Sequence, residues 1–169
     1  MDIVIDFDGT VVTHDFPNVG TDIGAVPVLK ELVANGHNLI LFTMRSDIVE
    51  PYSKSPEIVT ESGNYLTDAV NWFKDNEIPL YGVQRNPTQD TWTSSPKAYG
   101  QIIIDDAALG CPLLQDFKAI HTGGEIHSTL LSHLKHKQIK ELVGRPYVDW
   151  LRIRQILIDF GCLAAYVSS

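Results

Sequence analysis

Cysteine is scarce in this sequence, and its scarcity excludes a disulfide framework. Only two cysteines occur among 169 residues, Cys111 and Cys162, and they lack a CxxC spacing. We expect two reduced thiols that line the core. No apolar run reaches 18 residues, so we predict no membrane-spanning helix. The first apolar run follows Asp2 and belongs to the fold, not to a signal peptide, so we expect a cytoplasmic protein.

Positive charge is also in deficit. Thirteen lysines and arginines stand against 21 aspartates and glutamates, which gives a net charge of −8. This balance disfavours broad binding to nucleic acid or to an anionic membrane. It is compatible with a small anionic substrate, because a bound cation can reverse the sign of the local potential. No GxGxxG motif follows the first apolar run, which disfavours a dinucleotide-binding site.

The length and the apolar fraction of 44% are those of one globular domain spanning residues 1–169. We place the core of the domain at about 1–120 and a C-terminal helical segment at about 126–160. Apolar runs predict buried strands at 3–5, 38–43, 79–83, 101–106 and 117–122. Helical periodicity appears at 25–33, 66–73, 126–143 and 148–160, and turn-forming residues predict loops at 46–62 and 84–96. This alternation predicts an α/β fold: a doubly wound, Rossmann-like parallel sheet with helices on both faces.

Polar side chains gather where the predicted strands end. They are Asp6 and Asp8 after the first strand, Thr43 at the end of the second, and Asp105 and Asp106 at the end of the fourth, with Lys97 just before it. In an open parallel sheet, ligands bind beyond the carboxyl ends of the strands, so we expect these groups to share one site. Asp6 and Asp8 are two residues apart and point to the same side of an extended chain, and Gly9 eases the turn that follows.

Four carboxylates in one place repel one another and raise one another's pKa values. A divalent cation relieves the repulsion, and oxygen-only ligands suit Mg²⁺. A cation, a lysine and a hydroxyl around a carboxylate form a site for a phosphoryl group. One carboxylate can then attack phosphorus, and the other can protonate the leaving oxygen and later activate water.

Four motifs resemble those of the haloacid dehalogenase (HAD) superfamily. DFDGT follows an apolar strand, LILFT is an apolar strand ending in threonine, Lys97 stands at the place of the third-motif lysine, and IIIDD ends a further strand in an acidic pair. They occur in the family's order and cover about residues 1–112. The resemblance implies a phosphatase, since the second aspartate of the first motif is present as Asp8.

The resemblance also implies roles for single residues. Asp6 would be the nucleophile and a Mg²⁺ ligand, and Asp8 the general acid and base, with its backbone carbonyl also on the metal. Thr43 and Lys97 would hold phosphoryl oxygens, and Asp105 and Asp106 would complete the metal site. The substrate-binding set that we predict is Gly9, Thr43, Met44, Arg45 and Lys97.

The family's cap domains are inserted after the first motif or between the second and third motifs. Only 32 residues separate Thr10 from Thr43, and 53 separate Thr43 from Lys97, and predicted elements already fill both intervals. We therefore expect a capless member with an open site. Such a site suits a small phosphorylated substrate and is compatible with a homo-oligomer.

Two rival functions use similar residues. A receiver-type signalling domain also forms a phosphoaspartate, but its phosphorylated aspartate ends the third strand, where this chain has YGVQRN. A regulatory protein that binds metal and phosphate without turnover is the second rival, and the presence of Asp8 argues against it. A measured catalysed rate separates this rival from an enzyme.

Several other polar residues have more than one interpretation. Arg45 either reaches a second anionic group of the substrate or forms a salt bridge with Asp47 or Glu50. For His14, a place on the surface is favoured over a flap that closes on the substrate. For Gln84, Arg85 and Asn86, loop polarity is favoured over a place on the rim of the site. The histidines of the C-terminal third, His121, His127, His133 and His136, lack the partners of a zinc site. The three tryptophans, Trp72, Trp92 and Trp150, are assigned to packing.

Overall fold

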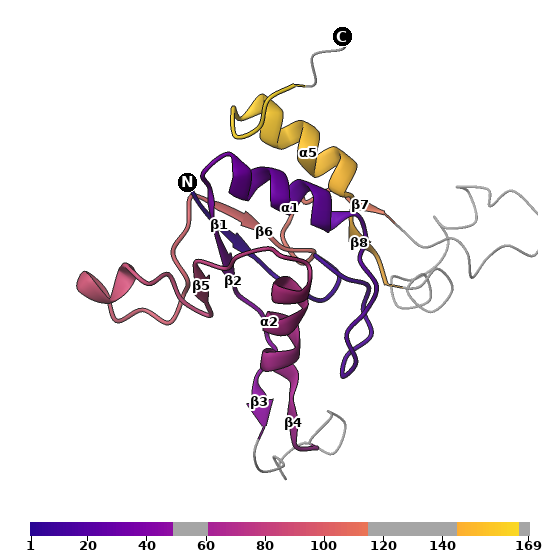
Figure 1. Cartoon of the computed structure of the whole chain (residues 1–169), viewed down its shortest axis with the longest axis vertical. Helices are drawn as coiled ribbons and strands as arrows, with labels where there is room; N and C mark the ends of the chain where they lie inside the picture. The colour runs from indigo at the N-terminus through magenta and orange to yellow at the C-terminus, as the bar shows by residue number, and fades with distance from the viewer. Residues whose placement is uncertain (49–60, 115–144, 166–169) are drawn as a thin grey trace, which may run out of the picture.

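The computed structural model describes residues 1–48, 61–114 and 145–165. Its centre is a four-stranded parallel sheet in the order β5-β2-β1-β6 (Figure 1). The strands are β1 (Asp2–Ile5), β2 (Asn38–Leu41), β5 (Gly82–Val83) and β6 (Ile102–Ile104). All three neighbouring pairs are parallel. The predicted α/β class and the predicted parallel sheet are therefore confirmed.

The register of the sheet aligns the carboxyl ends of its strands. Ile5 of β1 pairs with Leu41 of β2 on one side and with Ile104 of β6 on the other. Two further backbone bonds continue the alignment past the strands: Asp6 N–H donates to the Ile104 carbonyl at 3.0 Å, and Phe42 N–H donates to the Ile5 carbonyl at 2.9 Å. Whatever follows β1, β2 and β6 in the sequence therefore emerges at one edge.

Among the described residues, three helices contribute to the main core: α1 (Ala25–Ala34), α2 (Tyr65–Asp75) and α5 (Trp150–Asp159). The Asp22 carboxylate accepts from the first backbone N–H groups of α1, which fixes where this helix begins. Apolar residues of one sheet face join the buried residues of all three helices in a single cluster: Ile3, Ile5, Leu39, Leu41 and Ile104 from the sheet, and Leu29, Leu32, Ala69, Phe73, Ile153 and Leu157 from the helices.

The opposite face of the sheet is covered differently. Side chains alternate along a strand, so Val4 and Ile40 point away from the helical core, and they pack with Ala98 of the segment before β6. This segment includes a short 3₁₀ helix, η1 (Gln89–Thr91). Ile103 on this face is 46% exposed. Within the described ranges, the helices thus pack on one face and a loop covers part of the other.

Two small antiparallel sheets complete the described structure. β3 (Asp47–Ile48) pairs with β4 (Gly63–Asn64), so the prediction of a loop over 46–62 was wrong at its first residues. Figure 1 shows this pair at the N-terminal end of α2. The Asp47 carboxylate accepts from the backbone N–H groups of Leu66 and Thr67 and from the Thr67 hydroxyl, and the Thr67 hydroxyl is the main cause of a lowered Asp47 pKa.

β7 (Leu113–Leu114) pairs with β8 (Tyr147–Val148), a contact that no sequence pattern announced. α5 follows β8 and confirms the helix predicted over 148–160. The strand predicted at 117–122 and the helix predicted at 126–143 lie outside the described residues. No described helix has the length and apolarity that crossing a membrane requires. Both cysteines are free, and burial raises the pKa of the Cys111 thiol.

Candidate functional site

Three aspartates meet at the carboxyl edge of the sheet. Asp6 follows β1, and Asp105 and Asp106 follow β6, and one carboxylate oxygen of each lies within 4.8 Å of those of the other two. All three side chains are partly buried. The arrangement follows from the register of β1 and β6, because paired parallel strands deliver the residues after them to the same place. The prediction that these three residues lie together is confirmed.

The environment of Asp6 is unusual for a carboxylate. Its pKa is raised from 3.8 to about 6. Burial is the largest cause, because a low-dielectric surrounding disfavours the charged form, and the charges of Asp105, Asp106 and Asp8 act in the same direction. A hydrogen bond from the Phe7 backbone opposes them. A group of this kind is stabilised as an anion when a cation binds beside it.

The turn after β1 is shaped by Gly9 and Thr10. Gly9 has φ +81°, in the left-handed region, and a Cβ there would collide with the His14 ring and come 2.9 Å from an Asp106 oxygen. Thr10 is fully buried. Its hydroxyl accepts from the Asp106 N–H at 3.0 Å and lies 3.4 Å from an Asp6 oxygen, to which it donates. Thr10 thus links the residues that follow β1 and β6.

Asp8 does not join the three aspartates. Its carboxylate accepts two hydrogen bonds from Arg45, one from Nε and one from Nη2, each 2.7 Å long. The Arg45 side chain is only 1% exposed. The predicted alternative of a salt bridge between Arg45 and Asp47 was therefore wrong, since the partner is Asp8 and Asp47 caps α2. Glu50 lies outside the described residues.

Thr43 and Met44 follow β2 at the same edge. Gln84 holds the Thr43 backbone from both sides: its Oε1 accepts from the Thr43 N–H at 3.0 Å, and its Nε2 donates to the Thr43 carbonyl at 2.6 Å. Gln84 itself has φ +59°, a strained conformation for a residue other than glycine. Met44 is 97% exposed beside it. Loop polarity alone was therefore the wrong interpretation of Gln84, which positions Thr43.

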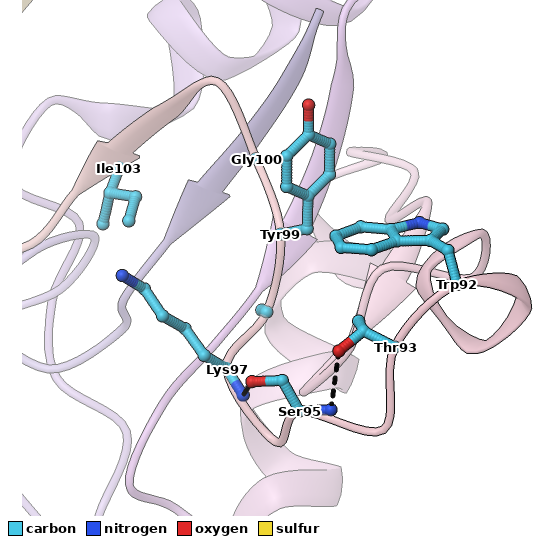
Figure 2. Close-up of a pocket in the computed structure, with 8 residues that line it drawn as sticks. Trp92, Thr93, Ser95, Lys97, Tyr99, Gly100 and Ile103 are labelled. Atoms are coloured by element: carbon cyan, nitrogen blue, oxygen red, sulfur yellow. Dashed lines mark hydrogen bonds between the residues drawn. The ribbon is translucent and has the colours of Figure 1, made fainter.

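Lys97 is exposed and forms no ion pair with any residue in the described ranges. It lines a pocket of about 270 Å³ on the less covered face of the sheet, with Trp92, Tyr99 and Ile103 among its neighbours. Figure 2 shows the Lys97 side chain extending toward Ile103 and away from Trp92. The residues that line this pocket include none of the three clustered aspartates.

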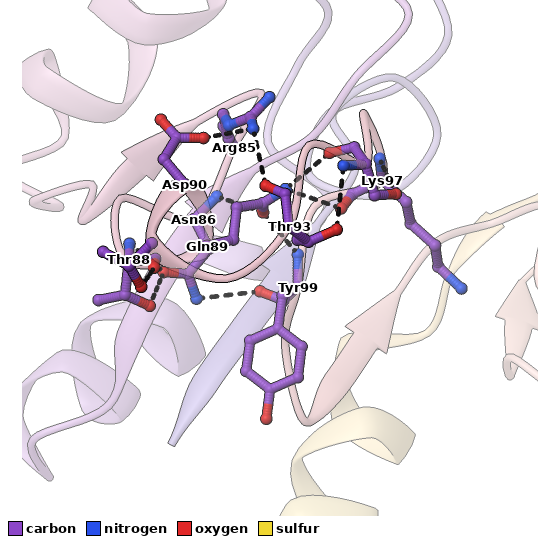
Figure 3. Close-up of polar contacts among 10 residues, drawn as sticks. Arg85, Asn86, Thr88, Gln89, Asp90, Thr93, Lys97 and Tyr99 are labelled. Atoms are coloured by element: carbon purple, nitrogen blue, oxygen red, sulfur yellow. Dashed lines mark hydrogen bonds and ion pairs between the residues drawn. The ribbon is translucent and has the colours of Figure 1, made fainter.

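A network of amides supports the segment that carries Lys97 (Figure 3). The fully buried Gln89 donates through Nε2 to the Ser95 and Lys97 carbonyls and accepts from the Tyr99 N–H. The fully buried Asn86 donates to Asp2 and to the Tyr99 carbonyl. Asn86 is therefore a core hydrogen-bonding residue, which corrects its assignment to ordinary loop polarity.

His14 was predicted at the surface, and this was wrong. Its side chain is 10% exposed, and its Nε2 lies 3.2 Å from an Asp106 oxygen and 3.2 Å from the Pro146 carbonyl. The segment after Pro146 also contacts the turn formed by Gly9 and Thr10. Val148 N–H donates to the Gly9 carbonyl at 2.8 Å, and Trp150 Nε1 donates to the Thr10 carbonyl at 2.6 Å. These C-terminal residues thus form part of the site's support.

Among known proteins, this chain resembles a protein whose structure has been solved. No protein-family model matches the sequence, and no curated protein matches it. A conserved protein from Bacteroides thetaiotaomicron, whose structure has been solved, shares 30% sequence identity with a TM-score of 0.52. The match covers 65% of this chain and 78% of the Bacteroides chain. At this identity and coverage, the chain belongs to the same family as that conserved protein.

Proposed function

We propose that the protein is a capless HAD-type phosphatase that hydrolyses a small phosphomonoester with the help of Mg²⁺. The observation that carries the proposal is the cluster of Asp6, Asp105 and Asp106, whose oxygens lie within 4.8 Å of one another. Oxygen donors at this spacing fit Mg²⁺, and the raised pKa of Asp6 is what a carboxylate held ready for a cation would have. When bound, Mg²⁺ would offset negative charge on the phosphoryl oxygens.

Asp6 is the proposed nucleophile. One of its carboxylate oxygens forms a bond to phosphorus while the bond from phosphorus to the leaving oxygen breaks, and Asp8 gives its proton to that oxygen. Water then attacks the aspartyl phosphate, Asp8 takes the proton from the water, and the bond between phosphorus and Asp6 breaks. Inorganic phosphate and the original carboxylate result.

We assign Thr43, Lys97 and Gly9 to the binding of the phosphoryl group. The Thr43 hydroxyl stands beyond β2, where Gln84 fixes its backbone. The ammonium of Lys97 has no carboxylate partner in the part of the chain that the structure describes, and it is available to a phosphoryl oxygen. Positioned cations of this kind supply much of the benefit in phosphoryl transfer. Met44, which is almost fully exposed, is assigned to the rim.

The finer fold assignment belongs to the same proposal. We propose a doubly wound sheet, because the strand order β5-β2-β1-β6 reverses its direction at β1. We propose that it lacks a cap, because the two intervals open to a cap insertion hold α1 and then β3, β4, α2 and β5 in the described ranges. A site without a cap is open, so its specificity depends on the rim of the sheet edge. A homo-oligomer remains a prediction.

The first experiment is hydrolysis of 4-nitrophenyl phosphate and of a panel of phosphorylated metabolites, with Mg²⁺ and with EDTA. We expect turnover that needs the metal and is absent in Asp6→Asn, and a phosphoryl group on Asp6 in acid-quenched wild-type protein. Turnover that persists in Asp6→Asn would contradict the assignment of the nucleophile. Mg²⁺ binding by calorimetry without hydrolysis of any monoester would replace the phosphatase by a metal-binding protein without catalysis.

A further inference from the structure

Arg45 is the charged residue that the described part of the fold buries, with 2% of its surface exposed. A buried charge is costly unless it is paired and hydrogen-bonded. Arg45 directs four hydrogen bonds at protein acceptors: two to Asp8, one to the Pro17 carbonyl and one to the Asn18 carbonyl. Its guanidinium carbon also lies 5.1 Å from the centre of the Phe7 ring and 5.2 Å from that of Phe16.

This degree of pairing needs a reason other than stability. Well-packed apolar residues of similar volume are often as stable as a buried ion pair, or more so. The fold nevertheless keeps a charged pair whose acidic member is the proposed general acid and base. The fork of an arginine holds a carboxylate in one plane and one direction, which a lysine cannot do.

Arg45 is also what fixes Asp8. Within residues 1–48, 61–114 and 145–165, the Asp8 carboxylate has no side-chain hydrogen bond other than the two from Arg45. A carboxylate has about four lone-pair positions, so two bonds leave it able to contact a leaving oxygen or a water. The same two bonds hold the Asp8 side chain apart from the cluster of Asp6, Asp105 and Asp106.

We propose that Arg45 is the positioning residue of Asp8. It fixes the direction in which the acid–base carboxylate points, and it couples that direction to residues 16–18 through its bonds to the Pro17 and Asn18 carbonyls and its contact with Phe16. This inference rests on the function proposed above. It replaces the expectation that Arg45 contacts the substrate, because the guanidinium is occupied and covered.

A pair of matched esters tests the proposal. Phenyl phosphate and 4-nitrophenyl phosphate are similar in shape, but phenolate is the poorer leaving group and needs protonation more. Loss of a well-placed acid therefore slows the hydrolysis of phenyl phosphate more than that of 4-nitrophenyl phosphate. In Arg45→Gln, we expect kcat/KM for phenyl phosphate to fall about tenfold more than kcat/KM for 4-nitrophenyl phosphate. In Asp8→Asn, kcat/KM for phenyl phosphate should likewise fall more than kcat/KM for 4-nitrophenyl phosphate. In Arg45→Lys, the ratio of the two kcat/KM values should lie between those of the wild type and of Arg45→Gln.

The chain contains its own control. Arg154 of α5 holds Glu31 of α1 with the same fork, through Nε at 2.8 Å and Nη2 at 2.7 Å, and it also donates to the Ala164 carbonyl. Arg154→Gln removes a similar ion pair, so it should lower the melting temperature while changing kcat/KM for both esters by the same small factor. A variant that only loosens the fold would behave in this way.

A second variant guards against misfolding of Arg45→Gln. Phe16 is 42% exposed, so Phe16→Ala is compatible with folding while it removes one ring beside the guanidinium. In Phe16→Ala, we expect kcat/KM for phenyl phosphate to fall more than kcat/KM for 4-nitrophenyl phosphate, but by a smaller ratio than in Arg45→Gln. Equal losses for both esters in folded Arg45→Gln and Phe16→Ala, or no loss, would overturn the inference and leave the phosphatase standing. If the wild type hydrolyses no monoester with Mg²⁺, both proposals fall.

Discussion

The two ends of β1 each carry an aspartate, and the two are held in opposite ways. At the amino end, the Asp2 carboxylate accepts from the Asn38 amide at 2.8 Å and from the Asn86 amide at 2.9 Å. At the carboxyl end, Asp6 faces Asp105 and Asp106, and its pKa rises to about 6. Neutral amide donors satisfy the first carboxylate, whereas burial and two neighbouring carboxylates disfavour the charged form of the second. One strand thus separates a carboxylate bonded to two amides from one whose neighbours are carboxylates.

The largest contrast should come from the same substitution at both ends. Asp6→Asn removes the proposed nucleophile and should lower kcat by at least about a thousandfold, while the metal-free protein keeps or gains stability. Asp2→Asn places an amide against two amide donors and should cost about 1–2 kcal/mol of unfolding free energy with unchanged kcat. Steady-state kinetics and urea unfolding of the two variants measure the contrast. Similar kinetics in both would remove the distinction between the two ends.

The next largest effect concerns the support of Asp2. Asn86 is fully buried, donates to Asp2 and to the Tyr99 carbonyl, and accepts from the N–H and hydroxyl of Thr88. Asn86→Ala leaves these groups without their partner and should lower the free energy of unfolding by about 2–3 kcal/mol. Mg²⁺ affinity at the other end of the strand should stay the same. A loss of Mg²⁺ affinity as large as the loss of stability would show that the two ends are coupled.

The pH dependence of stability sharpens the comparison further. The Asp6 pKa of about 6 in the folded protein exceeds its ordinary value of 3.8, so the folded state binds more protons between these values. Stability without metal should therefore fall as pH rises from about 4 to about 6, by about 2–3 kcal/mol for this group. Urea unfolding in EDTA from pH 4 to pH 7.5 measures it as the difference between wild type and Asp6→Asn. If the difference in unfolding free energy between the two proteins does not change with pH, the pKa of Asp6 is not raised.

The smallest expected effect lies at the neighbouring strand. Gln84 holds the backbone of Thr43 through two hydrogen bonds at the carboxyl edge. Gln84→Ala should let Thr43 shift and lower kcat/KM about tenfold, with only about 1 kcal/mol lost in stability. Asn86→Ala, at the amino edge, should instead lose more stability than kcat/KM. A large stability loss with unchanged kinetics in Gln84→Ala would make it a structural residue like Asn86.

The parts of the fold that sequence patterns predicted are those in which buried apolar runs carry the signal. Ile3–Ile5 and Ile102–Ile104 are such runs, and the rule that ligands bind beyond the carboxyl ends of parallel strands then placed Asp6, Asp105 and Asp106 together. The prediction rested on local pattern and on topology. Both are properties that a single sequence contains.

Such patterns could not predict which side chains pair with each other when they are far apart in the sequence. Arg45 is two residues from Asp47, and proximity in sequence made that pair one of the alternatives. A buried guanidinium, however, pairs with the carboxylate that packing brings to it, and this is Asp8. The strands Asp47–Ile48 and Gly63–Asn64 are two residues long, too short to show any period. His14 looked like a surface residue because nothing nearby in sequence indicates that Asp106 and Pro146 cover it.

The contact between Trp150 and the first-motif turn has a consequence for how the protein is made. The Thr10 carbonyl receives its hydrogen bond from a side chain 140 residues later in the chain, and the Gly9 carbonyl receives its own from Val148. A chain still on the ribosome can form the backbone bonds within residues 7–12 early, because they are local, but the Gly9 and Thr10 carbonyls gain these two partners only after residue 150 has left the exit tunnel. The turn after β1 therefore acquires its full set of hydrogen bonds late in folding, once the segment that contains Val148 and Trp150 docks against it.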